Sequence, residues 1–260
     1  CALPIFNKLR DNLSAIFHAA VSCGILLKNP CHCMSSLKES FPQRPYLSVE
    51  ECRELLNLLR TQDDREFELI ILTLLCTGMR IGELLALHWR DYDEARSVIY
   101  IRHTLARNNG EWFLSEPKTK SSYRRIVLPA SLSKQFSIYR ARYSIGNPSD
   151  DFPIFPNRNG NYLHSSTLNA RLKRLIRGTT LPQAIHLHSL RHTHASLLIN
   201  ANIPPNIVAD RLGHSSVKTT LDIYSHVYRE KEFLTADIIN SLLLRDSPQK
   251  NLQSVEYSQE

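Results

Sequence analysis

The sequence REFELIILTLLCTGMRIGELLALHW, residues 65–89, predicts a helix that is buried on all sides. Apolar residues occupy nearly every face of this helix up to Gly78, which is typical of a central helix rather than a surface one. The Thr-Gly pair ends this helix, and a second helix is expected to begin just after it. Arg80 therefore stands at the break in apolar surroundings, where a guanidinium is costly without an anionic partner. An ion pair with Glu83 would meet that need.

Two further helices are expected on the N-terminal side of this stretch. Residues 47–60, LSVEECRELLNLLR, contain a capping box in which Ser48 and Glu51 satisfy each other's backbone N–H groups. Residues 7–30 predict a helix with one apolar face, closed by Gly24. The polar, proline-containing segment between the two helices has the composition of a linker.

The hydrophobic period changes on the C-terminal side. Alternation of apolar and polar residues predicts three short antiparallel strands, at residues 98–105, 111–115 and 124–128. Helical patterns then return at residues 131–143, 165–177, 188–200, 204–211 and 216–227, with Gly213 ending the fourth of these helices. The expected fold class is therefore mostly α with a small antiparallel three-stranded sheet, an α+β protein.

The charge distribution indicates a polyanionic partner. The net charge is +7 and the isoelectric point about 9.2. From Phe152 to Ala209 the sequence contains no Asp or Glu, although it holds several arginines and histidines. Because a solvated surface usually mixes both signs, DNA or RNA is the expected partner. The basic residues expected to contact it are Lys120, Arg124, Arg171, Lys173 and Arg174.

Metal and membrane binding are not expected. The six cysteines form no CxxC pair, so the sequence predicts neither a zinc ribbon nor a disulfide framework. His188 and His192 have the spacing of two zinc ligands on a helix, but no carboxylate lies near them in the sequence. No apolar run approaches the roughly 18 residues of a membrane-spanning helix.

Four separate features fit a single chemistry. They are Arg80 after the helix break, the lysine-bearing turn EPKTKSSYRR at 116–125, His188 and Arg191 on one face of a helix start, and a segment from His214 to Tyr224. A phenol has a pKa of about 10 and attacks a phosphodiester poorly unless its proton is drawn away. Fixed cations must also stabilise the charge of the pentacoordinate phosphate. Two arginines, a lysine and two histidines would meet both demands.

These segments resemble the motifs of the tyrosine recombinase or phage integrase family. TGMRIGELLALHW is similar to the family's first arginine box, HSLRHTHAS to its His-x-x-Arg box, and LGHSSVKTTLDIYSHV to the box that ends in the nucleophile. PKTKSSYRRIVLP is similar to the β-hairpin segment that carries the family's lysine. The motifs occur in family order over about residues 46–228. The resemblance implies the catalytic-domain fold of that family.

The resemblance also implies roles for particular residues. Tyr224 would be the nucleophile that forms a 3′-phosphotyrosyl link to DNA, and Arg80 and Arg191 would clamp the scissile phosphate. Lys118 would be the general acid for the 5′ oxygen, although Lys120 on the same turn could take that role.

The histidines divide into two groups under the same resemblance. His188 and His214 would assist proton transfer and contact the phosphate. Glu83 resembles a family glutamate that holds the arginine box in place. The remaining histidines of the 185–199 segment are expected to be structural or near DNA, namely His186, His192 and His194.

The family pattern divides the chain into four parts. Residues 1–33 resemble only a remnant of a helical core-binding domain, and residues 34–45 form a linker. Residues 46–245 would be the catalytic domain, and residues 246–260 a polar C-terminal tail.

The expected protein is a cytoplasmic, bacterial or phage-encoded integrase. It would act on double-stranded DNA without a cofactor, for integration or excision of a mobile element or prophage, and would assemble as a homotetramer. Residues 229–244 predict an amphipathic helix, which would pack either onto the chain's own core or, as the resemblance implies, into a neighbouring subunit. Two alternatives stay open, a non-cleaving DNA-binding remnant of an integrase and a topoisomerase-like relaxing enzyme. The short hairpin-lysine segment disfavours the topoisomerase.

Overall fold

The computed structural model describes residues 3–35, 37, 45–108, 111–116, 120–143 and 149–221. The chain forms two compact units, Cys1–Arg44 and Pro45–Glu260, which are described separately. The first unit contains the long helix α1 (Leu3–Ser22) and the 3-10 turn η1 (Pro30–Cys33). The side-chain amide of Asn29 joins them, donating to the backbone carbonyl of Ser14 over 3.0 Å.

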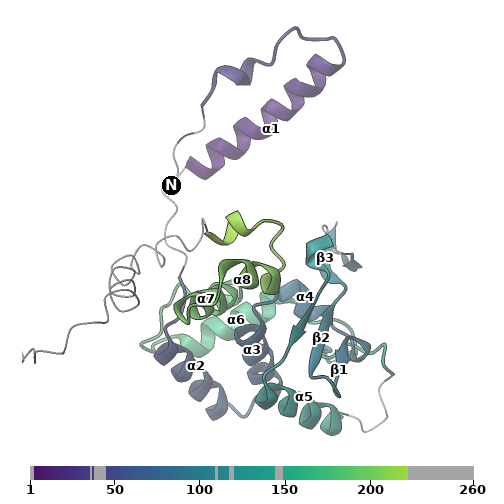
Figure 1. The fold of residues 1–260 in the computed structure, drawn as a ribbon, viewed down its shortest axis with the longest axis vertical. Coiled ribbons are helices and arrows are strands. Elements are labelled where there is room, and N and C mark those ends of the chain that lie inside the picture. Colours follow the sequence, from purple (N-terminus) through teal and green to yellow (C-terminus); the bar gives the residue numbers. More distant parts are fainter. Residues whose placement is uncertain are drawn as a thin grey trace, which may run out of the picture. The chain divides into compact units, whose positions relative to one another are not determined.

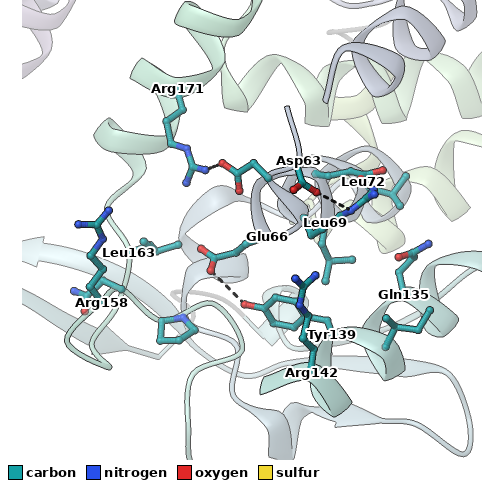
Figure 2. A pocket seen from close by; sticks show the side chains of 16 residues that line it. Asp63, Glu66, Leu69, Leu72, Gln135, Tyr139, Arg142, Arg158, Leu163 and Arg171 are labelled. Atoms are coloured by element: carbon teal, nitrogen blue, oxygen red, sulfur yellow. Dashed lines mark hydrogen bonds and ion pairs between the residues drawn. The ribbon is translucent and has the colours of Figure 1, made fainter. Parts of the chain in front are cut away.

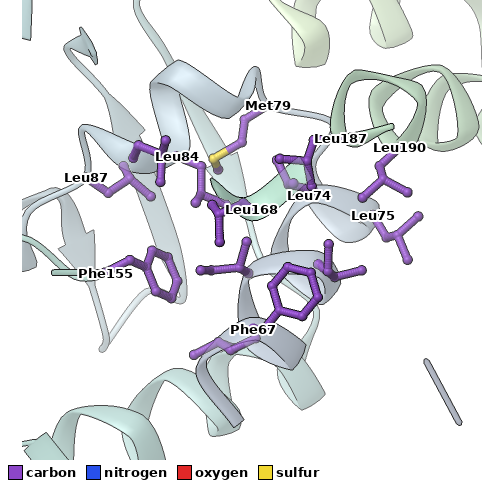
Figure 3. Packing of buried hydrophobic residues seen from close by; sticks show 14 of the residues in the cluster. Phe67, Leu74, Leu75, Met79, Leu84, Leu87, Phe155, Leu168, Leu187 and Leu190 are labelled. Atoms are coloured by element: carbon purple, nitrogen blue, oxygen red, sulfur yellow. The ribbon is translucent and has the colours of Figure 1, made fainter. Parts of the chain in front are cut away.

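The second unit is built around helix α3 (Arg65–Thr77), whose predicted burial is confirmed. Helices α2 (Val49–Thr61), α5 (Ala130–Tyr143) and α7 (Leu187–Asn200) pack against it (Figure 1). Figure 3 shows Leu168 of helix α6 (Ser165–Ile176) and two leucines of α7 in the same cluster as the leucines of α3. Because α3 is packed against several other elements, the residues at both of its ends are held in place.

The ends of α2 and α3 follow the local signals in the sequence. The capping box at α2 is present, because Glu51 N–H donates to Ser48 Oγ over 3.1 Å and Ser48 N–H to Glu51 Oε2 over 2.7 Å. Gly78 ends α3 with φ +64, a left-handed conformation that favours glycine. Helix α4 (Ile81–Leu85) begins directly after this break, as expected.

The strands differ in part from the prediction. The expected strand 98–105 is two strands, β2 (Val98–Ile101) and β3 (Thr104–Asn108). Between them the side chain of Arg102 pairs with Asp91 over 2.9 Å.

Two separate antiparallel sheets result. Strand β2 lies between β1 (Tyr92–Asp93) and β5 (Arg124–Val127), whereas β3 pairs with β4 (Glu111–Ser115) in a sheet of its own. The expected three-stranded sheet therefore exists, but β1 takes the place that was predicted for residues 111–115.

The remaining helices agree with the sequence patterns to within a residue or two at each end. Helices α5, α6, α7 and α8 (Pro205–Leu212) occupy the four predicted segments, and Gly213 ends α8 with φ +70. Residues 217–221 are helical, while the rest of the predicted helix 216–227 lies outside the described residues. No helix in the described part of the chain is long and apolar enough to cross a bilayer.

Candidate active site

Arg191 is a buried arginine near the start of α7 and is 4% exposed. Its Nη1 donates to the carbonyl oxygen of Gly78 and its Nη2 to that of Leu212, both over 2.8 Å. Gly78 caps α3 and Leu212 is the last residue of α8, so both acceptors stand at helix C-termini. Carbonyls there lack a partner within the helix and carry partial negative charge, which stabilises a buried guanidinium.

Arg80 is the residue that precedes α4, and its side chain is 41% exposed. Its backbone N–H and its Nη1 each donate to an oxygen of Glu83 over 2.8 Å. Its Nη2 reaches the carbonyl of Gly213 at 3.4 Å. The predicted ion pair with Glu83 is therefore present, and it aims the guanidinium toward the end of α8.

Glu83 is shared between two arginines. Arg124, from β5, donates from Nη1 to Oε1 over 3.1 Å and from Nη2 to Oε2 over 2.8 Å. Burial alone would raise the pKa of Glu83, but the two guanidinium groups outweigh it and the pKa is lowered. Glu83 is therefore a buried, ionised carboxylate.

The turn that ends α8 gathers the three arginines. Its successive carbonyls at residues 211, 212 and 213 accept hydrogen bonds from Arg124, Arg191 and Arg80 respectively. The three arginines come from three different segments of the chain, which lie far apart in sequence. Together they form a cationic cluster beside His214, the residue that follows the turn.

His214 is a half-buried histidine whose Nδ1 lies 2.8 Å from Thr220 Oγ1. Burial, followed by the charges of Arg191, Arg80 and Arg124, lowers the pKa of His214 to about 4. The imidazole is therefore neutral at neutral pH, and its protonation is disfavoured until negative charge lies beside it. A neutral base beside fixed cations suits a reaction in which negative charge develops on a phosphate.

His188 lies exposed at the start of α7. It is near enough to His214 to contribute to the lowering of its pKa. Its ring also packs edge-on against His192, with 4.9 Å between the ring centroids. The structure thus brings His188 to the same cluster as the arginines.

His194 and Arg211 form a second pair, joined by a hydrogen bond and close to Arg191. The Nδ1 of His194 is 2.8 Å from the carbonyl of Leu75, and Arg211 Nε donates to His194 Nε2 over 3.1 Å. Arg211 also donates to the carbonyl of Cys76 over 2.9 Å. His194 was expected to be structural or near DNA, and here it is buried inside the protein. Arg211 was not singled out, because a basic residue in a last helical turn is an ordinary feature.

Three predicted residues cannot be placed in this cluster. Lys118 and Tyr224 lie outside the described residues, as does the side chain of Lys120. Their roles stay predictions.

The residues predicted to contact DNA are spread over the unit. Arg124 is only 6% exposed, in the cluster already described. Lys173 and Arg174 are exposed on α6, where Lys173 Nζ donates to the carbonyl of Gln183. Their contact with DNA stays a prediction.

Arg171 lies in a groove of about 1000 Å³ at the other end of α3 from Arg80. It pairs with Asp64, the cap of α3, and stacks over the ring of Phe67 at 4.6 Å. Figure 2 shows Arg171 pointing toward that carboxylate and Glu66 toward Tyr139. This groove has acidic and basic walls and is distinct from the arginine cluster.

Among the residues that the structure describes, no three His, Cys, Asp or Glu side chains lie where they could share a metal ion.

Known proteins with similar sequences are integrases and transposases. Residues 45–231 match the model of the phage integrase family. The ICEBs1 integrase of Bacillus subtilis (strain 168) is 31% identical over 243 residues, which are 91% of this chain and 65% of that protein. The integrase of Staphylococcus phage L54a is 31% identical over 204 residues, 73% of this chain and 58% of the phage protein. The chain thus spans less than two thirds of the length of these relatives.

The fold has solved counterparts as well. The Tn1549 transposon integrase in complex with transposon right-end DNA superposes with a TM-score of 0.77 at 26% identity, covering 92% of this chain and 78% of that one. A lambda integrase dimer bound to a core site superposes with a TM-score of 0.57 at 18% identity, which supports the fold alone.

Proposed function

This chain belongs to the phage integrase family, and on that premise we propose that it cleaves and rejoins DNA at specific sites through a covalent 3′-phosphotyrosyl intermediate. The reaction would serve integration or excision of a mobile element or prophage. The observation that carries the proposal is the convergence of Arg80 and Arg191 on the turn that precedes His214. Cations held in this way by protein acceptors are pre-organised for a phosphate.

The chemistry begins with the hydroxyl of Tyr224. Its oxygen attacks the scissile phosphorus, and its proton passes to the neutral imidazole of His214. As the O–P bond forms, the bond from phosphorus to the 5′ oxygen breaks, and that oxygen takes a proton from Lys118 or Lys120. Rejoining is the reverse, because a 5′ hydroxyl then attacks the phosphotyrosine. The phosphotyrosine conserves the bond energy, so the reaction needs no ATP.

Arg191 and Arg80 are held in different ways, and each way suits this reaction. Arg191 is fully packed and fixed by two carbonyls, so it offers a rigid positive charge. Arg80 is more exposed and is oriented by Glu83. Both would bind the non-bridging oxygens of the phosphate, where charge increases in the transition state.

A nicked duplex that traps the covalent intermediate tests the proposal. Wild-type protein should give a protein–DNA band on a denaturing gel, and Tyr224→Phe should abolish that band while leaving duplex binding intact. A chelator should leave the band unchanged. Binding without any covalent band would instead identify a non-cleaving remnant, and relaxation of supercoiled plasmid without strand exchange would identify a topoisomerase-like enzyme.

We also propose that four copies assemble on DNA, with residues 229–244 making contacts between neighbours. The first unit would be part of a core-binding domain, and the exposed Lys173 and Arg174 would lie toward the duplex. Sedimentation of the protein on a duplex with two sites, with and without residues 229–244, tests the assembly. A complex of unchanged size after the deletion would contradict the role of that segment.

A further inference from the structure

We propose that Arg124 is a positioning residue, which holds Glu83 and the end of α8 so that Arg80 and His214 face the same phosphate. The inference rests on the proposed function and deepens it. Arg124 was predicted from the sequence to contact DNA, and the geometry points to an internal role instead.

The first argument is the number of protein acceptors around the guanidinium. Arg124 Nε donates to the carbonyl of Arg211 over 2.8 Å, and Nη1 donates to that of Ser122 over 3.2 Å. Nη1 and Nη2 also bind both oxygens of Glu83. These four bonds surround a side chain that is 6% exposed. Four of the five N–H groups of Arg124 are thereby engaged by protein acceptors, which leaves one for an incoming phosphate.

The second argument is the charge balance within the trio of Glu83, Arg80 and Arg124. Glu83 carries one negative charge and receives two positive ones, from Arg80 and Arg124. Without Arg124, Arg80 and Glu83 would form a neutral pair, and the carboxylate would hold Arg80 more tightly. With Arg124 present, the trio keeps a net positive charge, and Arg80 is its more exposed member. Arg124 therefore keeps the charge of Arg80 available for a ligand.

The third argument is steric. Arg124 packs directly against the turn at Gly213, where an added Cβ would lie 2.8 Å from Arg124 Nη1. The same turn leads into His214 and accepts hydrogen bonds from the arginines. Arg124 is also the first residue of β5, just past η3 (Lys120–Ser122). One side chain thus connects β5, α4 and the end of α8.

The experiment compares Arg124→Gln with Arg125→Gln. Arg125 is the next residue on β5, carries the same charge and is exposed on the opposite face of the strand, so it is a matched control. For each variant, the single-turnover rate of covalent complex formation is measured on a saturating nicked duplex. The affinity for an uncleaved duplex is measured over a series of salt concentrations.

Arg124→Gln should slow the saturating rate by about 10- to 100-fold, because a small displacement of catalytic groups has an effect of that size. The dependence of log K on log salt should not change, since no phosphate contact is lost. Arg125→Gln should leave the saturating rate unchanged. Combining Arg124→Gln with Glu83→Gln should give less than the product of the separate effects, because both act through Arg80.

Arg124→Lys covers the case in which Arg124→Gln does not fold. It keeps a positive charge beside Glu83 but loses the planar fork, so it should fold and still be slow. A salt slope lowered by about one, with an unchanged saturating rate, would overturn the proposal and make Arg124 a DNA contact. An unchanged rate with an unchanged slope would overturn it too. If wild-type protein formed no covalent product, the proposed function would fail, and the salt slope alone would still decide whether Arg124 is internal.

Discussion

Arg191 donates from Nη2 to the carbonyl oxygen of Leu212 over 2.8 Å, and this bond ties the start of α7 to the end of α8. The other arm of the same guanidinium binds the carbonyl of Gly78. One planar fork therefore satisfies one orphan carbonyl from each of two helices. Under the proposed function, folding stability and phosphate chemistry would therefore depend on the same side chain.

Replacing Arg191 by Lys should impair both properties. An ammonium cannot span both carbonyls in the geometry of the fork, so at least one buried acceptor loses its partner, at a cost of about 1–3 kcal/mol. Urea unfolding measures that loss. The covalent-complex rate should fall by about 100-fold or more, as it does when a fixed donor to a transition-state oxygen is removed. Arg177→Lys, at an exposed position after α6, is the control and should be silent in both assays.

Gly78 and Gly178 form a second matched pair. Both have positive φ, +64 and +75, so an alanine at either position is strained by about 1–2 kcal/mol. A Cβ at Gly78 would also lie 2.5 Å from His194 Cδ2 and 2.8 Å from Leu212 Cδ2, whereas nothing lies within 4 Å at Gly178. Gly78→Ala should therefore cost about 1–3 kcal/mol more than Gly178→Ala in urea unfolding. Equal costs would mean that the helix junction relaxes freely around the added methyl group.

The helices were predictable because their signals are local. The capping box at Ser48 and Glu51, and the glycines at 78 and 213, each mark a helix end within a few residues. The strand error arose at Arg102, where the alternating pattern continues but the ladder of β2 with β5 has ended at Ile101 and Arg102 pairs with Asp91. A pairing with a residue outside the strand leaves no trace in the strand's own period.

The arginine cluster was predictable only in part. The pair of Arg80 and Glu83 lies within one turn of helix, so the sequence indicates it directly. The bonds of Arg124 to Glu83 and of Arg211 to His194 join segments 41 and 17 residues apart. Backbone carbonyls are also the main acceptors for Arg191, and every residue has one. No residue type or spacing could therefore identify these bonds.

DNA binding should raise the pKa of His214. In the free protein, burial and the neighbouring guanidinium groups lower this pKa to about 4. A bound phosphate supplies negative charge that opposes the arginines and favours the protonated imidazole. NMR titration of the imidazole in Tyr224→Phe, with and without duplex, measures the shift. Arg80→Gln should raise the same pKa without DNA, and titrations that coincide in all three samples would contradict the proximity of His214 to the phosphate.

His194 should make the protein sensitive to acid. Its Nε2 accepts a hydrogen bond from Arg211, so the ring must be neutral with its proton on Nδ1, which donates to the carbonyl of Leu75. Burial, with the Leu75 carbonyl opposing it and Arg211 and Arg191 adding to it, lowers the pKa of His194 to about 4. The unfolded chain binds this proton near pH 6.5, so stability is fully present above that pH and falls as the pH drops toward 4.

The resulting loss at pH 4 is about 3 kcal/mol relative to neutral pH. Urea unfolding of wild type and of His194→Gln between pH 7.5 and pH 4 isolates the contribution of His194 to this loss. The carboxylates and His214 titrate in both proteins, so their contributions cancel in the comparison. As the pH falls to 4, the unfolding free energy of wild type should drop by about 3 kcal/mol relative to that of His194→Gln, since glutamine cannot take up the proton. Parallel pH profiles would mean that His194 titrates normally, and that Arg211 does not hold it in the neutral form.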